Sequence, residues 1–328
     1  MSRETQTASP TMATTATNSS NTVPELTPIA IAARGNEITG LDIFERTSED
    51  TTVARVKELM AEMNADKPTG GEDMAYADGD AHRLCFWNAK SRDAPLVLFV
   101  HGGSWQFGTY LDSIGSTKVS HLTAKGYAFA TINYTLVPSV TVEEQVQEVA
   151  NSLGYLVKNA ARLGFDPARV ILMGHSSGAH VVTLLGTDTG YLERAGVSID
   201  IVRGVISLDG SNYNAMAEII DSPGPVADNM KRGLGTDPKR LRAMSPTYNA
   251  RAPNAHAFLL LHVQRQGDIR QAVELAATLN AAGTDVALHV FEGQFFEGHV
   301  QMLLRLGNPA YPATLVMDRW LDTHVPVV

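Results

Sequence analysis

The sequence predicts an α/β fold with a mostly parallel central sheet and helices on both of its faces. From about residue 82, short strand-like runs alternate with helical patterns, the order expected of parallel strands joined by helical crossovers. Most of these runs are apolar at every position, as strands covered on both faces must be. The predicted strands are residues 95–103, 127–134, 169–174, 202–210, 257–263 and 285–293.

Two crossover helices are predicted between these strands. Residues 141–164 place apolar side chains on one stripe at helical spacing, and residues 270–283 end with a glycine in the helix-stop position. Residues 213–254 interrupt this rhythm with many prolines and glycines, which predicts a cap-like excursion over the active-site end of the sheet.

The chain is expected to form one domain over residues 25–328. Residues 1–24 lack bulky apolar groups and periodicity, which predicts a disordered tail. Residues 25–80 form an N-terminal segment with one amphipathic helix, in which Val53, Val56, Leu59, Met60 and Met63 have helical spacing.

Composition excludes several classes of partner. The 26 Lys and Arg against 35 Asp and Glu give a net charge of -9 without any basic run, so no nucleic-acid partner is expected. No run of about 18 apolar residues exists, so no membrane partner is expected. The N-terminal residues lack an export signal, which favours a cytoplasmic location. The single cysteine, Cys85, lies in an alternating apolar run and is predicted to be a buried strand thiol.

The stretch "LMGHSSGAHVV", residues 172–182, contains a G-x-S-x-G motif centred on Ser176. A predicted strand precedes it and a helix follows, the context in which this motif presents a nucleophilic serine on a strained turn. Ser177 then directs its backbone N–H toward a developing oxyanion, as Gly103 and Ser104 of "HGGSW" do after another strand. Tight turns alone do not predict that the two motifs occur together in this order.

The serine needs a base and an orienting acid, which follow it in the chain in this architecture. Asp268 and His299 each follow a predicted strand, at the edge where ligands meet an open parallel sheet, and are the preferred pair. Asp209, at the end of the strand 202–210, is the competing acid, ahead of the loop carboxylates Glu292 and Glu297.

The remaining candidates are assigned smaller roles. His101 is expected to brace the glycine loop, and His175 and His180 to pack beside the serine. Trp105 and Tyr213 lie near loop ends, where they are candidates to line an apolar substrate pocket. No His, Cys or carboxylate pair has metal-ligand spacing, so neither a metal nor a cofactor is expected.

With "HGGSW", "NYTLVPSV", "GHSSGAH", "GDIR" and "GHVQMLLRLG" in that order, residues 80–328 resemble the α/β-hydrolase superfamily. The similarity is greatest to kynurenine formamidases and small carboxylesterases of the feruloyl-esterase-like group. It implies Ser176 as nucleophile, Asp268 as acid, His299 as base, and the three backbone donors above as an oxyanion hole. Two departures are Ser177, where alanine is common, and "HVQRQGD", which lacks the usual HGxxD spacing.

These features predict a serine hydrolase that cleaves carboxylic esters of small or aryl acids through an acyl-enzyme. The alternatives are an amide hydrolase of the arylformamidase type, a lactone, polyester or toxin esterase, and a non-catalytic binding module on the same fold. The expected partner is a small-molecule ester or amide. The sequence leaves the oligomeric state open, with a homodimer among the alternatives.

Overall fold

The computed structural model describes residues 67–112 and 114–327, together with residues 58, 61, 62 and 65. The predicted tail, residues 1–24, lies outside the described residues. So does most of the predicted helix near residues 53–63, of which residues 58, 61 and 62 are described and helical.

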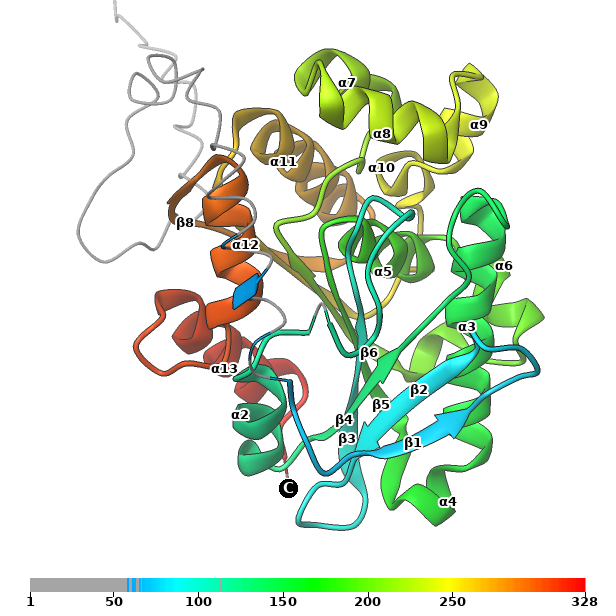
Figure 1. Ribbon diagram of the computed structural model, residues 1–328, viewed down its shortest axis with the longest axis vertical. Coiled ribbons are helices and arrows are strands. Elements are labelled where there is room, and N and C mark those ends of the chain that lie inside the picture. The colour runs from blue at the N-terminus through cyan, green and yellow to red at the C-terminus, as the bar shows by residue number, and fades with distance from the viewer. Residues whose placement is uncertain (1–57, 59–60, 63–64, 66, 113, 328) are drawn as a thin grey trace, which may run out of the picture.

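Eight strands form one sheet in the order β1-β2-β4-β3-β5-β6-β7-β8 (Figure 1). Strand β2 is antiparallel to both of its neighbours, and all the other pairs are parallel. The strands are β1 (Glu72–Ala75), β2 (Arg83–Trp87), β3 (Ala94–Val100), β4 (Ala128–Ile132), β5 (Phe165–His175), β6 (Val202–Leu208), β7 (Ala257–Gln264) and β8 (Asp285–Gln294).

Helices cover both faces of this sheet (Figure 1). They are α2 (Lys118–Lys125), α3 (Val142–Lys158), α4 (Ala160–Leu163), α5 (Ser177–Thr187), α6 (Thr189–Arg194), α7 (Ala215–Asp221), α8 (Pro225–Leu234), α9 (Pro238–Ala243), α10 (Pro246–Asn249), α11 (Gln266–Ala281), α12 (Phe295–Arg305) and α13 (Pro312–His324), with a short 3-10 turn over Ile199–Ile201.

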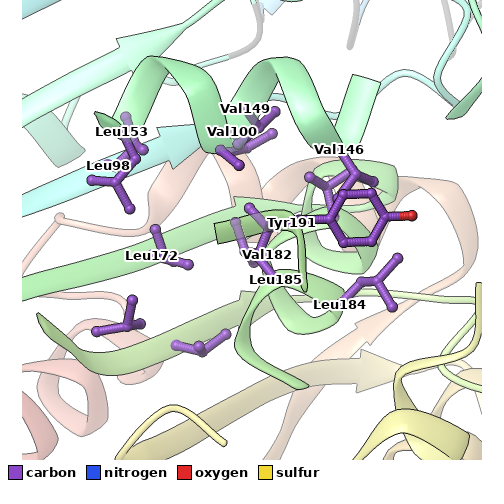
Figure 2. Packing of buried hydrophobic residues seen from close by; sticks show 14 of the residues in the cluster. Leu98, Val100, Val146, Val149, Leu153, Leu172, Val182, Leu184, Leu185 and Tyr191 are labelled. Carbon is purple, nitrogen blue, oxygen red and sulfur yellow. The ribbon is translucent and has the colours of Figure 1, made fainter. Parts of the chain in front are cut away.

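Alternation along the central strands divides the core between the two faces. Leu98 of β3 and Leu172 of β5 pack with α3, α5 and α6 (Figure 2). Phe99 and Met173, their neighbours in the chain, belong to the opposite layer with residues of α2, α12 and α13. Successive side chains of a strand point to opposite faces, so a run that is apolar throughout is buried on both sides.

All six predicted strands and both predicted crossover helices are present, and the architecture is that of the α/β-hydrolase fold. Edge strand β1 was not predicted, because only Met74 among its four residues is buried. Cys85 is buried in β2, as expected, and burial raises the pKa of its thiol to about 11. Within the described residues, no helix is long and apolar enough to span a membrane.

Residues 213–254 contain the four helices α7 to α10. Figure 1 shows α7, α8 and α9 together at one end of the molecule, beyond α10 and α11. Helix α8 packs on the loop after β3, since a side-chain carbon on Gly233 would lie 2.8 Å from the Trp105 ring. The Gln106 amide also donates to the Asn229 carbonyl over 3.3 Å. The excursion therefore contacts the loop that follows β3.

Truncation of Leu172 should lower the free energy of unfolding by about 2–5 kcal/mol, because this fully buried side chain would leave a cavity. Leu172→Ala is compared with Leu315→Ala, whose side chain on α13 is 50% exposed and should cost less than about 0.5 kcal/mol. Urea denaturation measures both. Equal losses for the two variants would contradict the buried position of β5.

Candidate active site

Ser176 forms the sharp turn between β5 and α5. Its backbone has φ 56° and ψ -123°, a conformation that residues other than glycine rarely adopt. Glycine is required on both sides of the turn because the chain closes tightly there. A side-chain carbon on Gly174 would lie 2.3 Å from the Gly178 carbonyl oxygen, and one on Gly178 would lie 2.2 Å from the Val100 carbonyl oxygen. The motif therefore forms the predicted strained elbow.

Backbone strain is concentrated at this end of the sheet. Seven described non-glycine residues have positive φ, and six of them lie in the segments that directly follow β3, β5, β6 and β8. Such positions cost about 1–3 kcal/mol each and persist only where the surroundings impose them. The six are Ser104, Trp105, Ser176, Asp209, Asn212 and Phe295.

The glycine loop after β3 lies directly against the elbow, since a side-chain carbon on Gly102 would meet Cβ of Ser176 at 2.9 Å. Within the described part of the chain, the N–H groups of Gly103, Ser104 and Ser177 have no protein acceptor. Ser177 is also the first residue of α5, where the positive end of the helix dipole adds to the field. Three free donors thus flank the Ser176 turn.

The loop is braced from several sides. The Trp105 N–H donates to Oγ of Ser177 over 3.2 Å. Alanine is common at position 177 in the related proteins, so the hydroxyl present here adds a hydrogen bond between the two loops. Gln145 of α3 donates its amide to the Trp105 carbonyl over 2.8 Å. His101 contacts the Gly102 carbonyl through Nδ1 at 2.8 Å and stacks on Tyr134, which agrees with its expected bracing role.

His299 lies in the first half of α12 and faces the same edge. Its Nδ1 is 2.6 Å from Oδ2 of Asp209, a separation that requires a proton between the two atoms. The neutral ring therefore carries its proton on Nδ1 and leaves Nε2 as an acceptor. His175 pairs with Leu208 across β5 and β6, so the next residues, Ser176 and Asp209, lie side by side.

The His299 ring packs against the residue that precedes the serine. The two ring centroids of His175 and His299 are 4.3 Å apart, and Nε2 of His175 lies 3.0 Å from the His299 carbonyl oxygen. The structure thereby places the candidate base next to the elbow, with its Nδ1 edge fixed by Asp209.

Asp209 is completely buried and its carboxylate has partners on both oxygens. Oδ1 accepts the Val263 N–H at 3.0 Å and lies 3.5 Å from Nδ1 of His262. Oδ2 accepts from His299 and, at 2.8 Å, from Arg265. Burial raises the pKa of Asp209, but Arg265 and the two histidines more than offset this and hold it well below its usual range. Asp209 is therefore ionised.

The prediction of Asp268 as the orienting acid is not met by this geometry. Asp268 lies in the first turn of α11, and its Oδ2 is paired with Nη2 of Arg265 at 2.8 Å instead of with His299. The reason is that β7 runs to Gln264 and α11 begins at Gln266, which leaves Arg265 facing the histidine. Asp209, the competing candidate, occupies that position from the neighbouring strand.

The two predicted pocket residues are also misassigned. Trp105 is 2% exposed, with its ring against α8 and His180. Tyr213 is completely buried and its hydroxyl contacts Ser207 and His262. Trp105 is covered by α8 of the excursion, whereas Tyr213 packs on the sheet against Ser207 of β6 and His262 of β7.

The electrostatic surroundings oppose protonation of His299. Burial is the main cause that lowers the pKa of its ring, and the nearby Arg265 cation adds to this, while Asp209 opposes both. Among the described residues, no group of three His, Cys, Asp or Glu is arranged to hold a metal ion. The site contains the groups needed for nucleophilic catalysis by an amino-acid hydroxyl.

Adding a methyl group at Gly178 should distort the elbow, because the new carbon would meet main-chain oxygens of Val100 and His101. We expect Gly178→Ala to lower the free energy of unfolding by about 1–3 kcal/mol. Gly190→Ala in α6 is the control, since its nearest neighbours are the ends of two flexible side chains. Thermal melts of both variants measure this, and an unchanged Gly178→Ala protein would contradict the tight turn.

Comparisons with known proteins agree with this architecture. Esterase B of Lactobacillus rhamnosis is 19% identical with a TM-score of 0.67, covering 82% of this chain and 91% of that one. Esterase 2 of Thermogutta terrifontis is 21% identical with a TM-score of 0.60, covering 79% of this chain and 94% of that one. At these identities the likeness concerns the fold.

Curated relatives match over shorter regions. Esterase LipC of Mycobacterium tuberculosis is 26% identical over 203 residues, which are 58% of this chain and 49% of that protein. Kynurenine formamidase of Danio rerio is 29% identical over 119 residues, 35% of this chain and 39% of that protein. The chain thus spans half or less of the length of these relatives. The BD-FAE family profile matches residues 85–263, more than half of the sequence, and the chain belongs to the BD-FAE family.

Proposed function

We propose that the protein is a serine hydrolase of carboxylic esters, with Ser176 as nucleophile, His299 as base and Asp209 as orienting acid. The observation that carries this proposal is the 2.6 Å contact between the buried Asp209 carboxylate and Nδ1 of His299, beside a serine on a strained strand-to-helix turn. A serine hydroxyl becomes nucleophilic only beside a base, and a buried anion holds a histidine in the tautomer that can act as that base.

In the first half of the reaction, Nε2 of His299 takes the Ser176 proton as Oγ attacks the ester carbonyl. The carbonyl oxygen becomes negative and is stabilised by the N–H groups of Gly103, Ser104 and Ser177. The C–O bond to the alcohol then breaks, and the imidazolium returns its proton to the leaving alkoxide. An acyl group remains bound to Ser176.

In the second half, His299 removes a proton from water, whose oxygen attacks the acyl carbon. The tetrahedral intermediate collapses, the acid leaves, and Oγ of Ser176 recovers the proton from the imidazolium. Asp209 stays ionised throughout and stabilises the imidazolium that forms in each half. Residues 213–254 act in this proposal as a cap, which agrees with the packing of α8 on the loop of Trp105.

The relatives support an ester substrate and leave one amide alternative. Their names include esterase LipC and an isoprenylcysteine α-carbonyl methylesterase of Arabidopsis thaliana. The formamidase of Danio rerio favours, as second candidate, hydrolysis of a formamide such as N-formylkynurenine. Rates with p-nitrophenyl acetate, butyrate and octanoate, set against N-formylkynurenine, discriminate between the two.

A fluorophosphonate should label Ser176 covalently, because the same base and donors that activate the serine toward an ester activate it toward phosphorus. Ser176→Ala should abolish labelling. Ser177→Ala is the matched control and should still be labelled, since the substitution retains the backbone N–H. Mass spectrometry of the labelled peptide identifies the residue, and labelling that persists in Ser176→Ala would refute the assignment.

The two candidate acids are separated by paired amide variants. Asp209→Asn should lower kcat by on the order of 10³-fold or more, because the amide no longer holds the required tautomer of His299. Asp268→Asn should lower it by less than about tenfold, since its carboxyl contacts Arg265. Steady-state hydrolysis of p-nitrophenyl butyrate measures both. A larger loss in Asp268→Asn would return Asp268 to the triad.

A further inference from the structure

One arginine contacts three ionisable groups at the centre of the site. Nη1 of Arg265 lies 2.8 Å from Oδ2 of Asp209 and 3.0 Å from Nδ1 of His299, and Nη2 lies 2.8 Å from Oδ2 of Asp268. The arginine side chain is 18% exposed, and both carboxylates are buried. The mechanism of a serine hydrolase assigns no task to such a cation.

The contact between Arg265 and His299 is electrostatic. Nδ1 already carries the proton that it shares with Asp209, so it has no lone pair to accept from the guanidinium. The guanidinium therefore places a positive charge 3.0 Å from a ring that must itself become positive during the reaction. Like charges at this distance disfavour the protonated ring.

Asp268 supplies the anchor that keeps the guanidinium in this place. Asp268 lies in the first turn of α11, and its Oδ2 contacts Nη2 of Arg265, three residues earlier in the chain. Within the described residues, Oδ1 of Asp268 has no hydrogen-bond partner. Burial, with help from Glu218 and Asp209, raises the pKa of Asp268 well above its usual range, and Arg265 opposes this. A carboxyl group accepts the Nη2 hydrogen bond in either protonation state.

We propose that Arg265 is a positioning residue that, anchored by Asp268, keeps His299 unprotonated in mildly acidic solution and so extends hydrolysis to lower pH. This inference rests on the proposed function. In this proposal Asp268, the acid that the sequence favoured, holds Arg265 in place and does not contact His299 itself.

Other charged and titratable groups also lie around the His299 ring. Asp209, directly after β6, favours the protonated ring, while His262 on β7 disfavours it. His175 on β5 packs against the ring at a tilt of 34°. Burial, followed by His299 itself, holds the pKa of His175 well below the usual range, so it stays neutral. Glu218 of α7 acts on Arg265. Among the residues that the structure describes, Arg265 is therefore the cation in contact with the ring.

The test is the pH dependence of kcat/KM, whose acid limb reports protonation of the base in the free enzyme. The parent limb should lie below the ordinary histidine value of about 6.5. Arg265→Gln should move the limb upward by about one unit or more, which is roughly tenfold lower activity at pH values below the limb. Activity on the alkaline plateau should change much less, and Arg265→Lys, which retains the charge, should stay near the parent.

Two further variants guard against a change in folding. Arg265→Gln leaves two buried carboxyl groups without their cation, so the double variant R265Q/D268N removes the anchor as well and should show the same shift. Arg270→Gln removes an arginine of α11 that pairs with Asp221 outside the site, and the acid limb of this variant should match that of the parent. Thermal melts establish that each variant is folded.

The outcomes separate this inference from the proposed function. A parent protein without ester turnover and without fluorophosphonate labelling would overturn the proposed function itself. An active parent whose acid limb stays within about 0.3 units in both Arg265→Gln and the double variant would overturn only the role of Arg265. An equal shift in Arg265→Lys would also overturn it, because charge would then not be the cause.

Discussion

The buried carboxylate of Asp209 is the constraint on which the carboxyl edge of the sheet depends. Moving a carboxylate out of water costs several kcal/mol, and this cost is offset only when its oxygens are fully bonded. The partners come from three segments, because Val263 and His262 belong to β7, Arg265 to the turn after it and His299 to α12. Satisfying this one anion therefore fixes how β6, β7 and α12 meet.

This constraint also explains why the acid was difficult to identify in the sequence. Ser176 and His299 are marked by local patterns, a glycine-flanked motif and a histidine after the last strand, and local patterns are readable without tertiary contacts. Asp209 ends one strand-like run and Asp268 follows another by a few residues, so the sequence does not separate them. The choice depends on Arg265, which directly follows β7 and contacts both Asp209 and His299.

The strands were predictable for a related reason. A central parallel strand is apolar on both faces, so it is visible in the sequence as a continuous apolar run, whatever packs on it. The burial of Trp105 and Tyr213 was not predictable in this way, because Trp105 is covered by α8, which lies far along the chain, and Tyr213 packs against Ser207 of β6 and His262 of β7. Aromatic residues near loop ends line a pocket in one tertiary context and fill the core in another.

The strained main chain and the bonded carboxylate of Asp209 both fix the geometry around Ser176. Ser176 and five other residues with positive φ lie directly after strands at this edge, and their cost is met by the close-packed sheet beneath. The hydroxyl of Ser177 is one contact that holds these segments together. As a side chain beside a nucleophile it looks redundant, yet by accepting the Trp105 N–H it joins segments that are 72 positions apart. In the proposed mechanism, this contact sets the spacing between the backbone donors and the attacking oxygen before substrate binds, so little rearrangement is needed when the oxyanion forms.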